Sequence, residues 1–218
     1  MGFSHYWYRP LKIEKDVFAN IAIDTKKVLN YLQKDLGIAI SGGFGEADTV
    51  PEITDDVIAF NGSDEQPAGL WTTTEQLGIV WPAPTASIDE PDADPTASKT
   101  NGSWFGGELV TQRVAPIDNL TGKGSGSYET FRIERELFLS ASSHKLQDKS
   151  FLEKGLVMYF CKTAYRPYDL AVTAVLIIVK HHDPTIEVCT DGEQKDWLDA
   201  MVICNNLLGY GMDFKLDS

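Results

Sequence analysis

Arginine placement is the feature of this sequence that points most directly to chemistry. The chain has five arginines, and four of them lie in three short segments rich in aromatic residues: His5-Tyr6-Trp7-Tyr8-Arg9, Tyr128 to Arg135, and Lys162 to Asp169. An arginine fork binds carboxylate or phosphate groups, and aromatic faces stack on bases or on guanidinium groups. If the three segments meet in the fold, they form a pocket for an anionic aromatic molecule such as a nucleotide.

The predicted ligand-binding residues are the charged and aromatic side chains of these segments. They are Trp7, Tyr8, Arg9, Arg132, Lys162, Tyr165, Arg166 and Tyr168. The third segment also opens a predicted helix, whose free N–H groups favour an anion. A structural interpretation stands beside this one and is favoured over it. In that interpretation Arg132 pairs with Glu129, Arg166 pairs with Asp169, and the tyrosines pack around the two ion pairs.

A second chemical hypothesis is acid–base catalysis. His5 or His181 would act as the general acid or base, assisted by Glu129 or Asp169, as in a hydrolase or phosphodiesterase. No zinc motif, nucleophile elbow or pair of His-x-Thr/Ser tripeptides supports it. His181 and His182 project about 100° apart on a helix, so they cannot easily share one metal ion. We therefore expect no metal site and no cofactor.

Two glycine-rich loops partly resemble nucleotide-binding motifs, but each lacks residues that the motif requires. Ser41-Gly42-Gly43-Phe44-Gly45 follows a predicted strand, yet Asp48 stands where a dinucleotide-binding loop has its third glycine. Thr121 to Ser127 lacks the first glycine of a phosphate-binding loop and the Ser/Thr after its lysine. Both segments are better interpreted as flexible turns.

Composition limits the function classes. The chain has 218 residues, a formal net charge of −13, and ordinary globular proportions of apolar and charged residues. So acidic a surface repels phosphate backbones, which excludes a general DNA or RNA binder. No signal-like leader and no apolar run of about 20 residues is present, so we expect a cytoplasmic protein away from the membrane. The three scattered cysteines suit buried free thiols in a reducing compartment.

The predicted organisation is a single domain spanning 1–218. Its core comprises 1–60 and 128–218, and 61–127 is a glycine- and proline-rich insertion that is mobile at about 83–100. Strands are expected at 4–8, 38–40, 57–60, 78–81, 107–114, 128–135, 156–161, 186–190 and 214–216, and helices at 14–36, 167–182 and 195–208. Asn61-Gly62 is expected to form a turn. This order predicts an α+β fold with a mixed sheet and helices mainly on one face.

The opening Ser4-His5-Tyr6-Trp7-Tyr8-Arg9 and the run CKTAYRPYDLAV from Cys161 to Val172 resemble a family of uncharacterised bacterial and phage proteins. The segment from Asp191 to Trp197 is similar to that family as well. The resemblance covers about a third of the chain and brings no catalytic residue with it. It implies a bacterial or viral intracellular setting, and a phage origin would favour a regulator or a counter-defence protein that binds a nucleotide signal.

Three functions remain open from sequence. The first is binding of a small anionic, nucleotide-like ligand, with the insertion acting as a lid. The second is a hydrolase acting on such a ligand. The third is an acidic interaction module or an inhibitor that docks a basic host protein. An oligomer is compatible with all three. The distances among Arg9, Arg132, Arg166 and His181 test the first two hypotheses, which lose their sequence basis if these residues lie on opposite sides of the domain.

Overall fold

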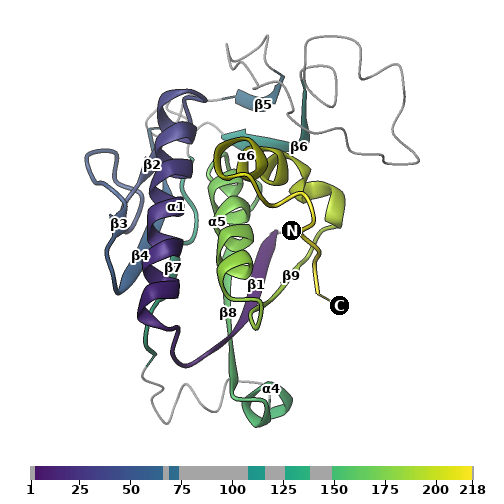
Figure 1. Ribbon diagram of the computed structural model, residues 1–218. Helices are drawn as coiled ribbons and strands as arrows, with labels where there is room; N and C mark the ends of the chain where they lie inside the picture. The colour runs from purple at the N-terminus through teal and green to yellow at the C-terminus, as the bar shows by residue number, and fades with distance from the viewer. Residues whose placement is uncertain (1–2, 66–68, 74–107, 116–125, 138–148, 218) are drawn as a thin grey trace.

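The computed structural model of the protein describes residues 3–65, 69–73, 108–115, 126–137 and 149–217. The helices are α1 (Lys15–Lys34), α4 (Lys149–Glu153), α5 (Asp169–His182), the 3-10 helix η2 (Gln194–Trp197) and α6 (Leu198–Leu208). The strands are β1 (Ser4–Pro10), β2 (Ile40–Ser41), β3 (Glu52–Ile53), β4 (Val57–Gly62), β5 (Gly69–Thr73), β6 (Glu108–Ala115), β7 (Phe131–Glu134), β8 (Leu156–Lys162) and β9 (Glu187–Thr190). Helices and sheets together confirm the predicted α+β class (Figure 1). The strand pairs of the described residues are all antiparallel and fall into three sheets, in place of the one mixed sheet that was expected.

The first sheet has the order β8-β1-β9, with β1 antiparallel to both neighbours. Side chains alternate between the two faces of a strand. His5, Trp7 and Arg9 are therefore buried, whereas Tyr6 and Tyr8 on the opposite face are only half-buried. The register sets Ser4 opposite Lys162 and Arg9 opposite Val157. The two ends of β1 thus lie in different surroundings.

The second sheet is centred on β4, which pairs with β2 and β3 along one edge and with β7 along the other. The prediction that Asn61-Gly62 forms a turn is wrong. Both residues continue β4, where Asn61 pairs with Ser41 and Gly62 with Ile40. The Asn61 side chain accepts a hydrogen bond from the Tyr128 N–H and donates one to the Tyr128 carbonyl, each at 3.1 Å. The Asn61 side chain, expected to belong to a turn, instead ties β4 to the chain preceding β7.

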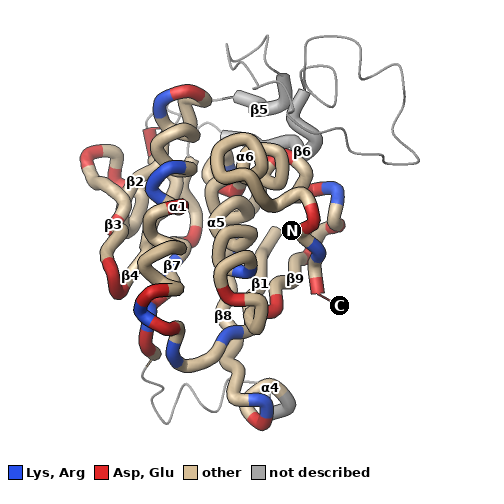
Figure 2. Tube along the Cα trace, viewed as in Figure 1, with Lys and Arg blue, Asp and Glu red and all other residues tan. Residues whose placement is uncertain are grey.

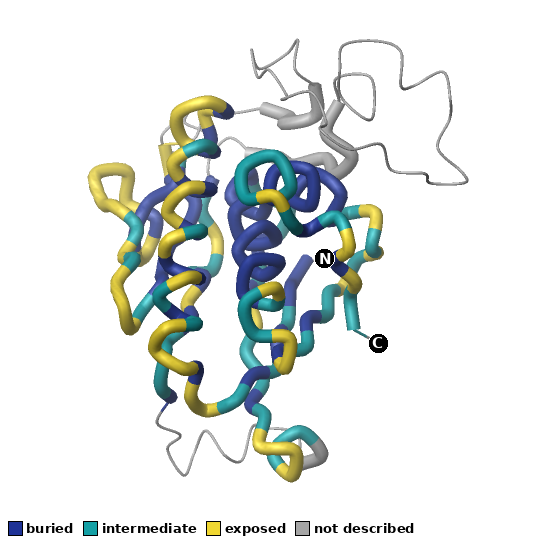
Figure 3. The backbone as a smooth tube through the Cα atoms, in the orientation of Figure 1, coloured by how far each residue is buried: buried dark blue, intermediate teal, exposed yellow. Residues whose placement is uncertain are grey.

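Three helices lie side by side on one face of the sheets, with α5 between α1 and α6 (Figure 1). α5 is apolar nearly all round, and its residues from Asp169 to Val179 are buried (Figure 3). Figure 2 shows charged residues only towards its ends. A helix without a polar face needs apolar neighbours on every side. α5 is therefore the central element of the core, as its composition predicts.

The remaining expectations have mixed outcomes. Phe214 to Leu216 does not form the predicted strand, although Asp217 N–H donates to the Val188 carbonyl beside it at 2.9 Å. β5 and β6 form an antiparallel pair within the proposed insertion. The predicted strand at 78–81 and the mobile segment at 83–100 lie outside the described residues. Among the helices that the structure describes, none is both long and apolar enough to cross a membrane.

Candidate functional site

The turn that joins β8 to α5, Thr163–Arg166, has an unusual backbone, and we name it the β8–α5 turn. Ala164 and Tyr165 have φ angles of 50° and 54°, in the left-handed region that glycine and asparagine normally occupy. The Arg166 N–H donates to the Thr163 carbonyl at 3.0 Å, which closes the turn. Positive φ at both central residues is the signature of a mirror-image type I′ turn. Strain of this kind persists only where the surroundings impose it, and it concentrates at functional sites.

Phe3 holds the β8–α5 turn from outside. Its carbonyl accepts hydrogen bonds from the N–H groups of Thr163 and Ala164, at 2.9 and 3.1 Å. Its ring stacks on the ring of Tyr165, with centroids 3.8 Å apart and planes inclined by 16°. The Tyr165 ring, expected from the sequence to stack on a ligand, therefore stacks within the protein on Phe3.

Two cations flank one tyrosine beside this turn. Lys162 Nζ lies 5.7 Å and the Arg166 guanidinium 5.8 Å from the centroid of the Tyr128 ring. Both distances fall within the range of cation–π attraction. The Tyr128 side chain is 44% exposed, so solvent reaches the group. We call Tyr128, Lys162 and Arg166 the cation–tyrosine cluster.

Arg166 is the least satisfied member of the cluster. Its Nε atom is buried and has no hydrogen-bond partner among the described residues. Burial lowers the pKa of the Arg166 guanidinium from its usual value. Arginine nevertheless stays charged at neutral pH. The cluster therefore combines a half-buried positive charge with a donor that still needs an acceptor.

Hydrogen bonds of Glu129 and Tyr168 fix the backbone of the cluster. The Glu129 carboxylate accepts a hydrogen bond from the Lys162 backbone N–H at 2.8 Å, and the Tyr168 hydroxyl donates to the Glu129 carbonyl at 2.6 Å. The Tyr168 side chain is fully buried, and this burial raises the pKa of its hydroxyl. Both residues therefore hold the backbone around Lys162, and the Tyr168 ring has no exposed face on which a ligand could stack.

His5 and Asp169 meet behind the β8–α5 turn. His5 Nε2 lies 2.7 Å from Asp169 Oδ1, and the Thr163 hydroxyl donates to the same oxygen at 2.5 Å. Both members of the histidine–aspartate pair are buried, with exposures of 0% and 1%. Asp169 also lies in the first turn of α5, where the helix dipole favours a carboxylate. Closed off from solvent, this pair has the position of a structural link rather than that of a catalytic acid and base.

Arg9 and Arg132 lie away from the cluster. Arg9 is 1% exposed, and its guanidinium donates to the carbonyls of Pro10, Glu134 and Arg135. Burial lowers the pKa of Arg9 to about 10. Arg132 pairs with Glu134 at 2.7 Å and with Glu52 at 3.7 Å, in place of the expected Glu129.

The two ends of β1 therefore have different roles. Ser4 on β1 pairs with Lys162 of the cluster, and Arg9 lies five residues further along β1. At about 3.3 Å per residue, Arg9 is therefore about 17 Å from the cluster. Trp7 packs in the core against Phe131, and Tyr8 stacks on Phe151 with centroids 3.7 Å apart. The structure therefore brings together Lys162, Tyr165, Arg166, Tyr168, Glu129, His5 and Asp169. It leaves Trp7, Tyr8, Arg9 and Arg132 elsewhere, so the pocket of three arginines does not form.

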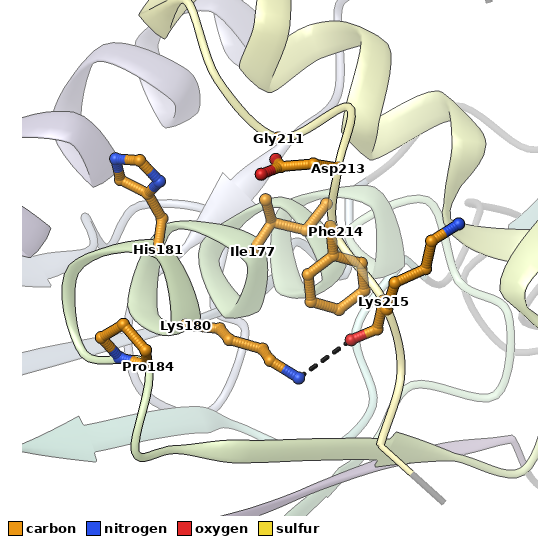
Figure 4. Close-up of a pocket in the computed structure, with 8 residues that line it drawn as sticks. All are labelled: Ile177, Lys180, His181, Pro184, Gly211, Asp213, Phe214 and Lys215. Carbon is orange, nitrogen blue, oxygen red and sulfur yellow. Dashed lines mark hydrogen bonds between the residues drawn. The ribbon is translucent and has the colours of Figure 1, made fainter.

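His181 belongs to a different region, at the far end of α5. It lines a pocket of about 290 Å³ together with Lys180, Asp213 and Phe214 (Figure 4). The amine of Lys180 is already engaged, because it donates to the Lys215 carbonyl at 2.9 Å and pairs with Asp217. α5 separates this pocket from the β8–α5 turn by about 20 Å. His181 cannot act on a ligand held by the cation–tyrosine cluster.

A hydrogen-bonded group that the sequence did not reveal lies beside this pocket. Asp24 of α1 accepts hydrogen bonds from His182 Nε2 at 2.9 Å and from the Tyr210 hydroxyl at 2.8 Å. His181 stacks on the ring of Tyr210, with centroids 3.6 Å apart. Burial lowers the pKa of His181 from its usual value. In the part of the chain that the structure describes, no group of three or more His, Cys, Asp or Glu side chains is arranged to hold a metal ion.

Comparison with known proteins found no matching family model, no matching curated protein and no matching solved structure. The functional argument therefore depends on the geometry of this chain alone. The resemblance of its opening and Cys161–Val172 segments to bacterial and phage proteins stays a prediction.

Proposed function

We propose that the protein binds a small, phosphate-bearing anionic ligand of the nucleotide class at the cation–tyrosine cluster. This smaller site replaces the predicted three-arginine pocket, which does not form, and keeps only Lys162 and Arg166 of its cations. The observation that carries this proposal is the pair of cations at Tyr128, one of which has a buried donor without an acceptor. A buried donor left unpaired costs about 1–3 kcal/mol. An anionic oxygen bound between Lys162 and Arg166 would offset the repulsion between them, and a shift of the Arg166 side chain on binding would bring its buried Nε to the missing acceptor.

The members of the cluster suit different parts of such a ligand. Lys162 supplies a compact positive charge and Arg166 a planar fork, the two modes by which proteins hold phosphate. The exposed part of the Tyr128 ring can contact a base. A single pair of cations in a chain of net charge −13 favours a small anion over a polyanion, whose remaining phosphates would meet acidic surface.

The proposed setting is a cytoplasmic regulator or counter-defence protein, following the resemblance to bacterial and phage proteins. Sequestration of the ligand is favoured over hydrolysis, because the histidine and carboxylates nearest the cluster are buried or hydrogen-bonded to the backbone. Mass spectrometry of a nucleotide incubated with the protein separates the two activities. An unaltered nucleotide supports sequestration, and a cleaved one supports the hydrolase.

Isothermal titration calorimetry tests the binding proposal. The titrants are inorganic phosphate, pyrophosphate, and adenine and guanine nucleotides. The Arg166→Gln and Lys162→Gln variants are each expected to weaken binding by about tenfold or more, the worth of one charge-assisted hydrogen bond. Arg132→Gln is the matched control, since it removes one arginine charge from an exposed ion pair away from the cluster. Absence of heat with every titrant, or equal losses in all three variants, would overturn the proposal.

A further inference from the structure

We infer that Thr163, Asp169 and His5 form a positioning network that holds the β8–α5 turn in its mirror-image conformation and thereby sets the anion affinity of Arg166. This inference rests on the proposed function of the cation–tyrosine cluster. It assigns a role to the buried histidine–aspartate pair, which the binding site does not otherwise use.

The network clamps the chain on both sides of Arg166. Thr163 is the first residue of the turn, three positions before Arg166, and Asp169 follows three positions after it. The Thr163 hydroxyl donates to Asp169 Oδ1 at 2.5 Å, so one short hydrogen bond closes a loop around the arginine. The Asp169 N–H also donates to the Arg166 carbonyl at 2.9 Å. The backbone that carries the guanidinium is therefore fixed at its start, its middle and its end.

His5 anchors this clamp to the sheet. Its Nε2 lies 2.7 Å from Asp169 Oδ1, and its Nδ1 lies 3.2 Å from the Thr190 hydroxyl on β9. The side chains of His5 and Asp169 are both buried, and a buried carboxylate is stable only when it is hydrogen-bonded. His5 therefore fixes Asp169 in position, and Asp169 in turn fixes Thr163.

The clamp opposes a local preference of the backbone. Ala164 and Tyr165 both prefer negative φ, since a Cβ atom crowds the following carbonyl in the left-handed region. Without the Thr163–Asp169 hydrogen bond, the two residues would relax towards ordinary φ values. That relaxation would turn the backbone at Arg166 and move its guanidinium away from Tyr128 and Lys162. The network is thus expected to keep the two cations together before any ligand binds.

Thr163→Val tests the network, because it removes the hydroxyl at nearly constant volume. Pyrophosphate affinity, measured by calorimetry, is expected to fall about tenfold in Thr163→Val and to stay within about threefold of the wild type in Thr163→Ser. Adding Ala164→Asn to Thr163→Val should restore most of the loss, since asparagine tolerates the left-handed region. Because relief of strain at residue 164 can also stabilise the fold, the thermal midpoint of every variant is measured beside its affinity. A loss and a rescue of affinity at a temperature where all variants are fully folded indicate a positioning role rather than general destabilisation.

Carbon-13 chemical shifts of residues 164 and 165 report the turn conformation without any ligand. They are expected to lose their positive-φ signature in Thr163→Val and to keep it in Thr163→Ser. If Thr163→Val does not fold, Asp169→Ala, which removes the acceptor of the Thr163 hydroxyl, serves in its place, and wild-type affinity in that variant would overturn the inference. Wild-type protein that binds neither pyrophosphate nor any of the other phosphate and nucleotide titrants would overturn the proposed function. A different result would overturn the network and leave the proposed function standing. In that result the wild type binds pyrophosphate, and Thr163→Val has the same affinity and unchanged carbon-13 shifts.

Discussion

At the scale of single residues, Arg9 shows how an arginine in an aromatic segment can serve the fold instead of a ligand. Its buried guanidinium donates to three backbone carbonyls, including those of Glu134, the last residue of β7, and of Arg135, which follows it. Arg9→Met would remove this donor from the carbonyls of Pro10 and Glu134 and leave the Arg135 carbonyl with the Ile13 N–H, so we expect it to reduce the free energy of unfolding by about 3–5 kcal/mol. Urea unfolding measures this loss. Arg132→Met, at an exposed ion pair, should change it by less than about 1 kcal/mol. Similar losses in both variants would contradict the structural role of Arg9.

Ala164 carries the second prediction at this scale. Its φ of 50° costs an alanine about 1–2 kcal/mol and costs glycine nothing. Ala164→Gly should therefore raise the midpoint of thermal unfolding, unlike most glycine substitutions. Two controls bracket the effect. Ala174→Gly in the middle of α5 and Gly37→Ala, at a φ of 65° after α1, should both lower the midpoint. A lower midpoint in Ala164→Gly would show that the turn is not strained.

At the scale of elements, Asp24 in the middle of α1 joins this helix to the C-terminal end of α5 through His182 and to the chain just after α6 through Tyr210. Burial raises the pKa of Asp24, but hydrogen bonds from His182, Lys27 and Tyr210 outweigh it and hold that pKa below its ordinary value. A carboxyl whose pKa is lower in the folded state stabilises the fold above its unfolded pKa, and this stability is lost as the pH falls through the folded pKa. Acidification below about pH 4 should therefore destabilise the wild type more steeply than Asp24→Asn. Thermal unfolding across pH 2–7 measures the difference, with Asp16→Asn on exposed α1 surface as the control. Parallel curves for wild type and Asp24→Asn would contradict it.

Elements whose patterns are local were predictable from sequence, and contacts between elements were not. The stripe of α1 and the uniform apolarity of α5 each determine burial from their own residues, and both helices form close to their expected bounds. Asn61-Gly62 was misjudged because its pairing partner, β2, lies twenty residues earlier in the chain. The site was half predictable. The residues of the Lys162–Asp169 segment lie together in the fold because they are close in sequence. The Arg9 guanidinium instead donates to carbonyls of Glu134 and Arg135, which are distant in sequence, and no local pattern predicts that contact.

At the scale of the whole molecule, the net charge of −13 and the local pair of cations act on an anion over different distances. The acidic surface repels the anion from afar, and Lys162 and Arg166 attract it only at contact. Salt ions screen the interaction between charges that are more than about 30 Å apart at 0.01 M ionic strength, and more than about 8 Å apart at 0.15 M. Added salt should therefore weaken the repulsion first, so the association rate of pyrophosphate should rise over this range. Stopped-flow fluorescence measures that rate. Arg166→Gln should bind more weakly while its rate shows the same upward trend, because the global field is nearly unchanged. An association rate that falls with salt would place the anion in a region of positive long-range potential, which this charge distribution does not provide.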